Sequence, residues 1–160
     1  MPVYYHQTPL GLARIEADDA YVFSLTVHEQ TGTDATDANG VIKQAAAQLD
    51  EYFAGLRQAF DFPHRQKGTS FQQRVWQELE KISFGKTITY TQQSQRLNDP
   101  LAIRAIASAN GKNSMWIVVP CHRVIGVDGS LTGYAGGLWR KQWLLKHEAK
   151  VLGVGQTSLF

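Results

Sequence analysis

Near the start of the chain, apolar residues form short runs that are typical of strands. Farther along, they recur at the spacing of a helix. Short runs rich in Val, Tyr, Ile, Phe and Leu occupy residues 2–8, 11–17 and 20–28. They predict a small antiparallel sheet of hairpins. The polar, Gly/Asp/Thr-rich segment Thr31–Gly40 is expected to be a loop. From Val41 to about Leu56 the period becomes helical, and Gly55 is typical of a helix terminus.

The next part of the chain favours helices. Thr69 or Ser70 can cap a helix that continues toward Gly85. The side chains expected on its inward face are Phe71, Val75, Trp76, Leu79 and Ile82. Two shorter helices follow at Tyr90–Leu97 and Leu101–Asn110, with Asp99 as the expected cap of the second and Pro100 at its first position. Two helices across so short a turn predict a helix-turn-helix.

The last third of the chain combines irregular segments with one more helix. Ile117–Val119 is expected to be a short buried strand that Pro120 ends. Tyr134–Gly137 is expected to be a loop, and Trp139–His147 a helix. The predicted fold class is therefore α/β (α+β). We expect residues 1–62 to form a scaffold domain of sheet plus helix, and residues 63–160 a mostly helical domain.

Charge is segregated along the chain although its net value is only +2. Residues 1–62 carry three basic and nine acidic side chains, a net of −6, whereas residues 63–160 carry thirteen basic and five acidic ones, a net of +8. A basic half of this kind favours a polyanionic partner, with nucleic acid as the first candidate. A solvated basic face without a partner is the alternative.

Composition narrows the class of protein further. With 43% hydrophobic and 19% charged residues the chain is typical of a globular domain. A single cysteine excludes an intrachain disulfide and a zinc site built on several thiolates, so no metal or cofactor is expected. No apolar run is long enough to cross a bilayer, and no secretory signal is visible, so we expect a cytoplasmic protein without a membrane partner.

Candidate chemistry gathers around that cysteine. Pro120 places Cys121 at the end of an element, and the basic neighbours His122 and Arg123 are expected to lower the thiol pKa toward the reactive thiolate. Glu148 is a candidate third member that would orient the imidazole. The alternatives are a structural buried cysteine and a solvated carboxylate at a helix end.

At this point a family resemblance becomes visible. The string Ile117–Gly126, with its core Pro120–Val124, closely resembles the active-site signature of the O6-alkylguanine-DNA alkyltransferases, the methylated-DNA–protein-cysteine methyltransferases. Tyr-x-Gly-Gly at 134–137 and Trp-Leu-Leu-x-His-Glu at 143–148 add to the likeness, which runs from about residue 69 to 148. Within that family the chain resembles the bacterial, single-cysteine form. The function implied is direct reversal of DNA alkylation on O6-alkylguanine, with O4-alkylthymine as a further candidate lesion.

The resemblance implies roles around the thiol. Cys121 corresponds to the alkyl acceptor, which reacts once and irreversibly. His122 and Glu148 correspond to the histidine and glutamate that a water links to the thiol. Asn113 corresponds to the asparagine that holds the active-site turn together, and Tyr90 to the tyrosine that crowds the DNA phosphate and hydrogen-bonds the extruded base.

Further roles concern DNA and the flipped base. Arg104 corresponds to the arginine finger that replaces the extruded nucleotide, and small Ala102 and Ala105 would let the recognition helix approach the minor groove closely. The main-chain carbonyls of Cys121 and Val124 would accept from the guanine amine. Tyr134 and Ala135 correspond to the loop over the base, where the Ala135 amide would face O6.

These roles imply a monomer that binds double-stranded DNA with little sequence preference. Three positions depart from common family residues: Ile103 in the recognition helix, Trp116 ahead of the cysteine, where it raises a question about pocket width, and Ala135 in place of a serine. Two other functions remain open from the residues themselves. One is a cysteine hydrolase that uses Cys121, His122 and Glu148, and the other is a non-catalytic helix-turn-helix DNA-binding protein.

Overall fold

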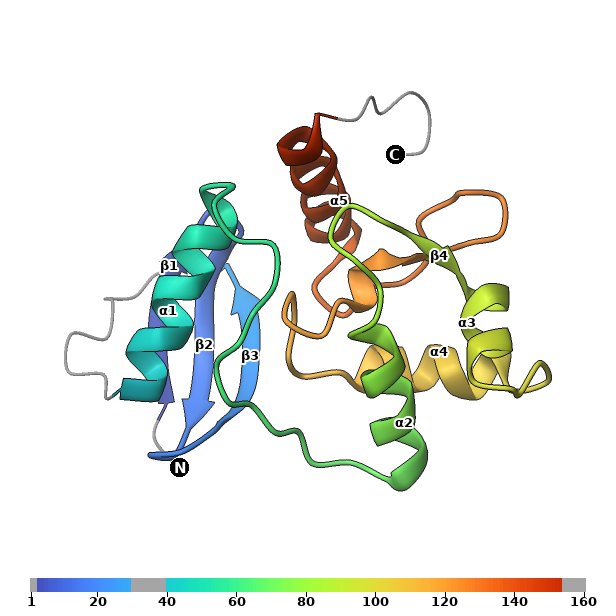
Figure 1. Cartoon of the computed structure of the whole chain (residues 1–160), viewed down its shortest axis with the longest axis horizontal. Helices are drawn as coiled ribbons and strands as arrows, with labels where there is room; N and C mark the ends of the chain where they lie inside the picture. The colour runs from blue at the N-terminus through green and yellow to red at the C-terminus, as the bar shows by residue number, and fades with distance from the viewer. Residues whose placement is uncertain (1–2, 30–39, 154–160) are drawn as a thin grey trace. The chain divides into compact units, whose positions relative to one another are not determined.

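Figure 1 shows the computed structural model of the chain, which describes residues 3–29 and 40–153. The chain divides into two compact units. The first comprises Met1–Lys67 together with Ser114–Trp116, and the second comprises Gly68–Asn113 together with Ile117–Phe160. Most of the loop expected over 31–40 lies outside the described residues. In the described ranges, no helix is long and apolar enough to cross a membrane.

The first unit is built on an antiparallel sheet in the order β1-β2-β3. Its strands are β1 (Val3–Thr8), β2 (Gly11–Ala17) and β3 (Val22–His28). Helix α1 (Gly40–Phe53) lies across the sheet (Figure 1). The apolar side chains of strands and helix meet in one core, which includes Ile15, Leu25, Ile42, Leu49 and Tyr52. The predicted sheet and helix are confirmed, with strand bounds within two residues of those expected.

Two later segments pair with β3 and define the extent of this unit. The Val22 N–H donates to the Pro63 carbonyl, and the Arg65 N–H donates to the Val22 carbonyl. The unit therefore ends after Lys67 and not after Phe62, because residues 63–65 are hydrogen-bonded to the strand. Farther along β3, the Leu25 N–H donates to Ser114 O at 2.7 Å, and the Trp116 N–H donates to Leu25 O at 2.9 Å. These bonds satisfy backbone groups that an edge strand leaves open.

The second unit contains most of the helices. Its elements are α2 (Ser70–Leu79), β4 (Ile88–Thr89), α3 (Tyr90–Arg96), α4 (Ile103–Lys112), the 3₁₀ turn η1 (Cys121–Arg123), β5 (Val124–Ile125) and α5 (Leu138–Leu152). The short strands β4 and β5 pair in parallel. Buried side chains from several of these elements form the core, among them Val75, Trp76, Leu79, Ile106, Val124 and Leu144. Helices α3 and α4 form the predicted helix-turn-helix (Figure 1).

Two helices in this unit, α2 and α3, begin directly after a threonine that caps them. Thr69 and Thr89 each accept a hydrogen bond from the backbone N–H three residues later, and the glutamine there returns one to the cap backbone. Such capping boxes satisfy two orphan donors reciprocally. Helix α2 ends at Leu79, earlier than expected, because the backbone continues in three-residue turns such as Ile82 N–H to Leu79 O.

The expected start of the recognition helix is wrong. Asp99 donates its N–H to Ser94 O and accepts from the Ala102 N–H, so Asp99–Ala102 form a turn before the helix. Helix α4 begins at Ile103, two residues later than expected, and its N-cap Ala102 makes no side-chain capping bond. Leu101 is 96% exposed in this turn and not part of the apolar face.

The expected strand at Ile117–Val119 is also wrong. These residues form a buried turn in which Ile117 has φ +73°. A short apolar run cannot be assigned to a strand by its pattern alone. Here the backbone groups that pair with a strand belong to the three residues before the run, 114–116. The final helix is longer than predicted and ends at Gly153, whose φ of +71° suits a glycine.

Candidate active site

Two tight turns place Cys121 at the wall of a pocket. Pro120 has φ −84° and ψ 65°, and the Cys121 N–H donates to Val119 O at 2.8 Å. These are the features of an inverse γ-turn. The 3₁₀ turn η1 follows at once, with the Arg123 N–H donating to Pro120 O at 3.0 Å. The backbone thus bends twice within a few residues, and Cys121 lies at the bend.

The thiol itself is held by an amide. Asn113 Nδ2 donates to Val119 O at 2.9 Å and to Cys121 Sγ at 3.4 Å. Burial raises the pKa of the Cys121 thiol, and the Asn113 hydrogen bond and the positive charge of Lys141 only partly offset that rise. The resting sulfur is therefore a thiol at neutral pH. The expectation that its sequence neighbours lower the thiol pKa is wrong, because Arg123 faces a different partner.

That partner is Glu148, which collects donors behind the cysteine. Its carboxylate accepts from His122 Nε2 at 2.8 Å and from Arg123 Nε and Nη2 at 2.9 and 3.0 Å. It also accepts from the Gly85 N–H at 3.0 Å. Burial alone would raise the pKa of Glu148, but His122 and Arg123 outweigh it and hold the pKa well below its usual range. Glu148 is ionised, and the fork of Arg123 balances its charge.

Because Arg123 already neutralises Glu148, His122 need not be charged. Burial lowers the pKa of His122 despite the nearby carboxylate. An ionised carboxylate only accepts hydrogen bonds, so Nε2 carries the proton and Nδ1 is an unprotonated acceptor. Nδ1 is buried and makes no hydrogen bond with any described residue. The imidazole therefore has one nitrogen fixed by Glu148 and a basic nitrogen left available.

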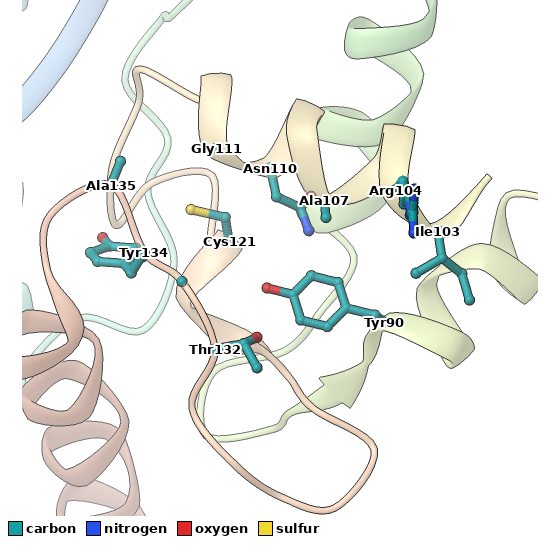
Figure 2. Close-up of a pocket in the computed structure, with 11 residues that line it drawn as sticks. Tyr90, Ile103, Arg104, Ala107, Asn110, Gly111, Cys121, Thr132, Tyr134 and Ala135 are labelled. Atoms are coloured by element: carbon teal, nitrogen blue, oxygen red, sulfur yellow. The ribbon is translucent and has the colours of Figure 1, made fainter.

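Cys121 opens onto a cavity of about 430 Å³ (Figure 2). Its lining comes from α3, α4, η1 and the segment 132–135, and comprises Tyr90, Ile103, Arg104, Ala107, Asn110, Gly111, Cys121, Thr132, Gly133, Tyr134 and Ala135. In Figure 2 the Tyr90 hydroxyl points into the cavity, and Arg104 and Ile103 lie at the side away from Cys121. A concave site with a few polar groups suits a small-molecule ligand or group.

The predicted site residues fall into three groups. Cys121, Tyr90, Arg104, Tyr134 and Ala135 share the pocket. Behind Cys121 lie the hydrogen-bonded Asn113, His122 and Glu148. Outside the lining are Val124, which is buried in β5, Ala102, which caps α4, and the exposed Ala105.

Two of the three departures from common family residues, Ile103 and Trp116, lie in different places. Ile103 lines the pocket and is 38% exposed. Trp116 is not among the residues that line the pocket, and its backbone N–H donates to the carbonyl of Leu25.

Sequence reasoning missed several polar residues near the pocket. Arg123 lay next to the cysteine in the sequence, but nothing there indicated that it faces Glu148. Lys141 is buried and donates to Thr132 O at 3.0 Å, which ties α5 to the pocket segment. Gln93 and Asn110 form a buried amide pair between α3 and α4. In the described residues, no three His, Cys, Asp or Glu side chains are grouped to hold a metal ion.

Known proteins resemble this chain in sequence and in structure. The family model described as "6-O-methylguanine DNA methyltransferase, DNA binding domain" matches residues 70–150. The methylated-DNA–protein-cysteine methyltransferase of Mycolicibacterium paratuberculosis is 42% identical over 147 residues, with 89% of each chain covered. The constitutive one of Bacillus subtilis is 40% identical over 138 residues, which cover 81% of this chain and 84% of that protein.

A solved structure of a related protein has a similar fold. The structure of Mycobacterium tuberculosis OGT in complex with DNA aligns with a TM-score of 0.84 at 39% identity and covers 93% of each chain. The site geometry, the sequence relatives and this structural match agree over most of the chain. The chain belongs to the methylated-DNA–protein-cysteine methyltransferase family.

Proposed function

We propose that the protein repairs alkylated DNA by transferring the alkyl group of an O6-alkylguanine to Sγ of Cys121. The observation that carries this proposal is a thiol at the wall of a pocket, backed by a neutral histidine whose other nitrogen is fixed by a buried carboxylate. O4-alkylthymine, which presents a similar alkyl ether, is a second candidate lesion.

The resting thiol must lose its proton before it can attack. The structure has no hydrogen bond between Sγ and the imidazole of His122 among the described residues, so we assign one bridging water to the proton's path to Nδ1. As the imidazole becomes positive, Glu148 stabilises it through Nε2. Asn113, which already donates to Sγ, would stabilise the thiolate.

The transfer is one displacement at the alkyl carbon. The S–C bond forms while the C–O6 bond breaks, and the oxygen stays on guanine as a carbonyl. Guanine takes up one proton, and His122 later releases the one it received, so the proton count balances. The product is a thioether, and the site holds no group that would cleave it. Each molecule therefore acts once.

The base must leave the duplex to reach the thiol, because its O6 atom lies inside the helix stack. Arg104 on α4 lies at the pocket rim and would fill the gap that the flipped nucleotide leaves. The small side chains of Ala102 and Ala105 would let α4 approach the minor groove closely. A minor-groove contact with few base-edge donors gives little sequence preference, which suits a repair protein that acts as a monomer anywhere in DNA.

Inside the pocket the base would meet both side chains and backbone. The Tyr90 hydroxyl would hydrogen-bond the ring, and Tyr134 and Ala135 would cover it, with the Ala135 N–H toward O6. The carbonyls of Cys121 and Val124 would accept from the guanine amine. Held by these contacts, the base would present its alkyl carbon to Sγ of Cys121.

The test is incubation with duplex DNA that carries a radiolabelled O6-methylguanine. The expected result is one label per protein, on the peptide that contains Cys121, and none on Cys121→Ala, although that variant still binds the DNA. A cysteine hydrolase would release label over many turnovers, and a non-catalytic DNA-binding protein would acquire none. Either result would exclude the proposal.

A further inference from the structure

Helix α3, which carries Tyr90 at its first position, lacks the usual means of docking. A helix normally attaches through a stripe of apolar side chains. The buried residues of α3 are instead Gln93 and Ser94, both polar. The Ser94 hydroxyl donates to Thr91 O and so stays within the helix. The buried apolar residues Ile88 and Leu97 flank the helix, so they fix where the chain enters and leaves it.

The side chain of Gln93 reaches from α3 to α4. Its Nε2 donates to Asn110 Oδ1 at 2.8 Å, and Asn110 Nδ2 donates back to Gln93 Oε1 at 2.9 Å. Gln93 is fully buried and Asn110 is 7% exposed. Two antiparallel hydrogen bonds between planar amides fix both the distance and the orientation of the groups that they join.

Asn110 is itself held in place on the other side. Trp76 Nε1 of α2 donates to the carbonyl of the preceding residue, Ala109, at 2.9 Å. The Asn113 N–H donates to the Asn110 carbonyl at 3.3 Å, and the Asn113 side chain contacts Cys121 Sγ. The C-terminal end of α4 is therefore tied to α2 and to the thiol turn. Helix α3 joins this frame through the Gln93 side chain, and Arg74 of α2 also donates to the carbonyl of its C-cap residue Leu97 at 3.1 Å.

We propose that Gln93 and Asn110 are positioning residues, which set Tyr90 on α3 relative to Arg104 on α4 so that a base extruded from a duplex meets Cys121. This inference rests on the proposed function. Tyr90, Arg104 and Asn110 all line the one cavity, from the two helices that the amide pair joins (Figure 2).

Relative position matters more for a flipped base than for a free one. A free base can adjust its pose in a pocket whose walls have shifted slightly. A flipped base is tethered to its duplex, and the duplex is placed by α4 and Arg104. A shift of α3 against α4 then moves Tyr90 away from a base that cannot follow. Small misplacements of this kind cost rate, because the reacting atoms must be closely aligned.

The experiment compares two substrates, duplex DNA with O6-methylguanine and free O6-benzylguanine. Gln93→Leu leaves Asn110 unpaired, and we expect its rate on duplex DNA to fall at least tenfold more than its rate on the free base. The double variant Gln93→Asn/Asn110→Gln restores a reciprocal amide pair and should recover most of the duplex rate. A merely structural role would lower stability without changing the ratio of the two rates.

Gln48→Leu is the matched control, since Gln48 is also a buried glutamine with two hydrogen bonds, both to Asp61, in the other unit. It should lower the unfolding midpoint and leave the ratio of rates as in the native protein. Equal losses on both substrates in Gln93→Leu, or an unaltered duplex rate, would overturn the inference. Failure of the proposed function is distinguishable, because the native protein itself would then transfer no alkyl group.

Discussion

At the residue scale, the reactivity of Cys121 depends on which of its buried neighbours carries charge. Arg123 forms a two-pronged pair with Glu148 and balances the charge of the carboxylate, while a neutral His122 still donates a hydrogen bond to it. A neutral imidazole can accept a proton, whereas an imidazolium cannot. Arg123 would therefore act indirectly on the thiol, by keeping His122 neutral.

The first prediction concerns this relay. His122→Ala and Glu148→Gln should slow alkyl transfer by about 100-fold, a typical contribution of a positioned base, while binding to alkylated DNA changes little. Single-turnover rates and binding on the same duplex separate the two effects. Glu148→Gln also leaves Arg123 buried without its charged partner, which costs about 3–5 kcal/mol of stability. This variant should therefore be assayed at a temperature below its own unfolding midpoint. Transfer at the native rate in Glu148→Gln would reduce Glu148 to a structural carboxylate.

The second prediction concerns the pH dependence of stability. In the unfolded chain His122 takes up a proton as the pH falls through about 6.5, while burial keeps it neutral in the folded protein to lower pH. The unfolded state then binds more protons, so the free energy of unfolding falls by up to about 1.4 kcal/mol per pH unit. Below about 4.5, the depressed pKa of Glu148 acts in the same direction.

Urea unfolding of the native protein and of His122→Gln at pH 7, 6 and 5 measures the effect. The glutamine keeps a donor for Glu148 and does not titrate, so the variant should lose less stability between pH 6.5 and 5. Identical slopes for the two proteins would mean that the folded state protonates His122 as readily as the unfolded state does.

At the element scale, the sequence pattern predicted those elements whose surroundings in the fold favour the same structure as their local sequence. The hairpin strands alternate or are bounded by turn residues, and Thr69 and Thr89 cap helices that start where their capping boxes indicate. The pattern failed where hydrogen bonds to backbone outside the element determined where the element begins. The Asp99-Pro100 pair is a sound helix start locally, but Asp99 bonds back to Ser94, so the turn continues past it.

In the candidate site, too, some residues could be predicted from the sequence and others could not. The positions of Cys121, His122 and Glu148 could be predicted, because a specific sequence motif carries them. The partner of Arg123 could not, since 25 residues separate it from Glu148 along the chain. Gln93 and Asn110 likewise gave no signal, because polar residues in helices are usually on the solvated face.

The third prediction concerns Arg104, whose side chain makes no ion pair or hydrogen bond with the described residues and lines the pocket. As the residue that replaces a flipped nucleotide, it offsets part of an unstacking cost of a few kcal/mol. Arg104→Ala should therefore lose much more rate on duplex DNA than on free O6-benzylguanine. An ordinary phosphate contact would instead weaken binding uniformly and reduce the salt slope by about one.

Lys112→Ala is a matched control, because it removes an exposed cation from the other end of α4. It should leave the ratio of duplex to free-base rates as in the native protein. Equal losses on both substrates in Arg104→Ala would mean that Arg104 shapes the pocket, and its role in base extrusion would have to be withdrawn.

At the scale of the whole molecule, charge follows the division into two units. The first unit has five basic and nine acidic side chains, a net of −4, and the second has eleven basic and five acidic ones, a net of +6. The positive unit is the one that carries the pocket and α4. A field of this sign attracts a polyanion toward that unit, and added salt should weaken the attraction.

The last prediction treats the molecule as a reagent that is consumed. A thioether at Cys121 has no leaving group that the site could expel, and the proposed proton relay through His122 would serve only to form it. Restored base should therefore increase until it equals the amount of protein and then stop, however large the excess of O6-benzylguanine. Intact mass should rise by one benzyl group, and Cys121→Ala should show no change. A steady state that continues through many turnovers would instead require a step that frees the sulfur, and the single-displacement mechanism would be wrong.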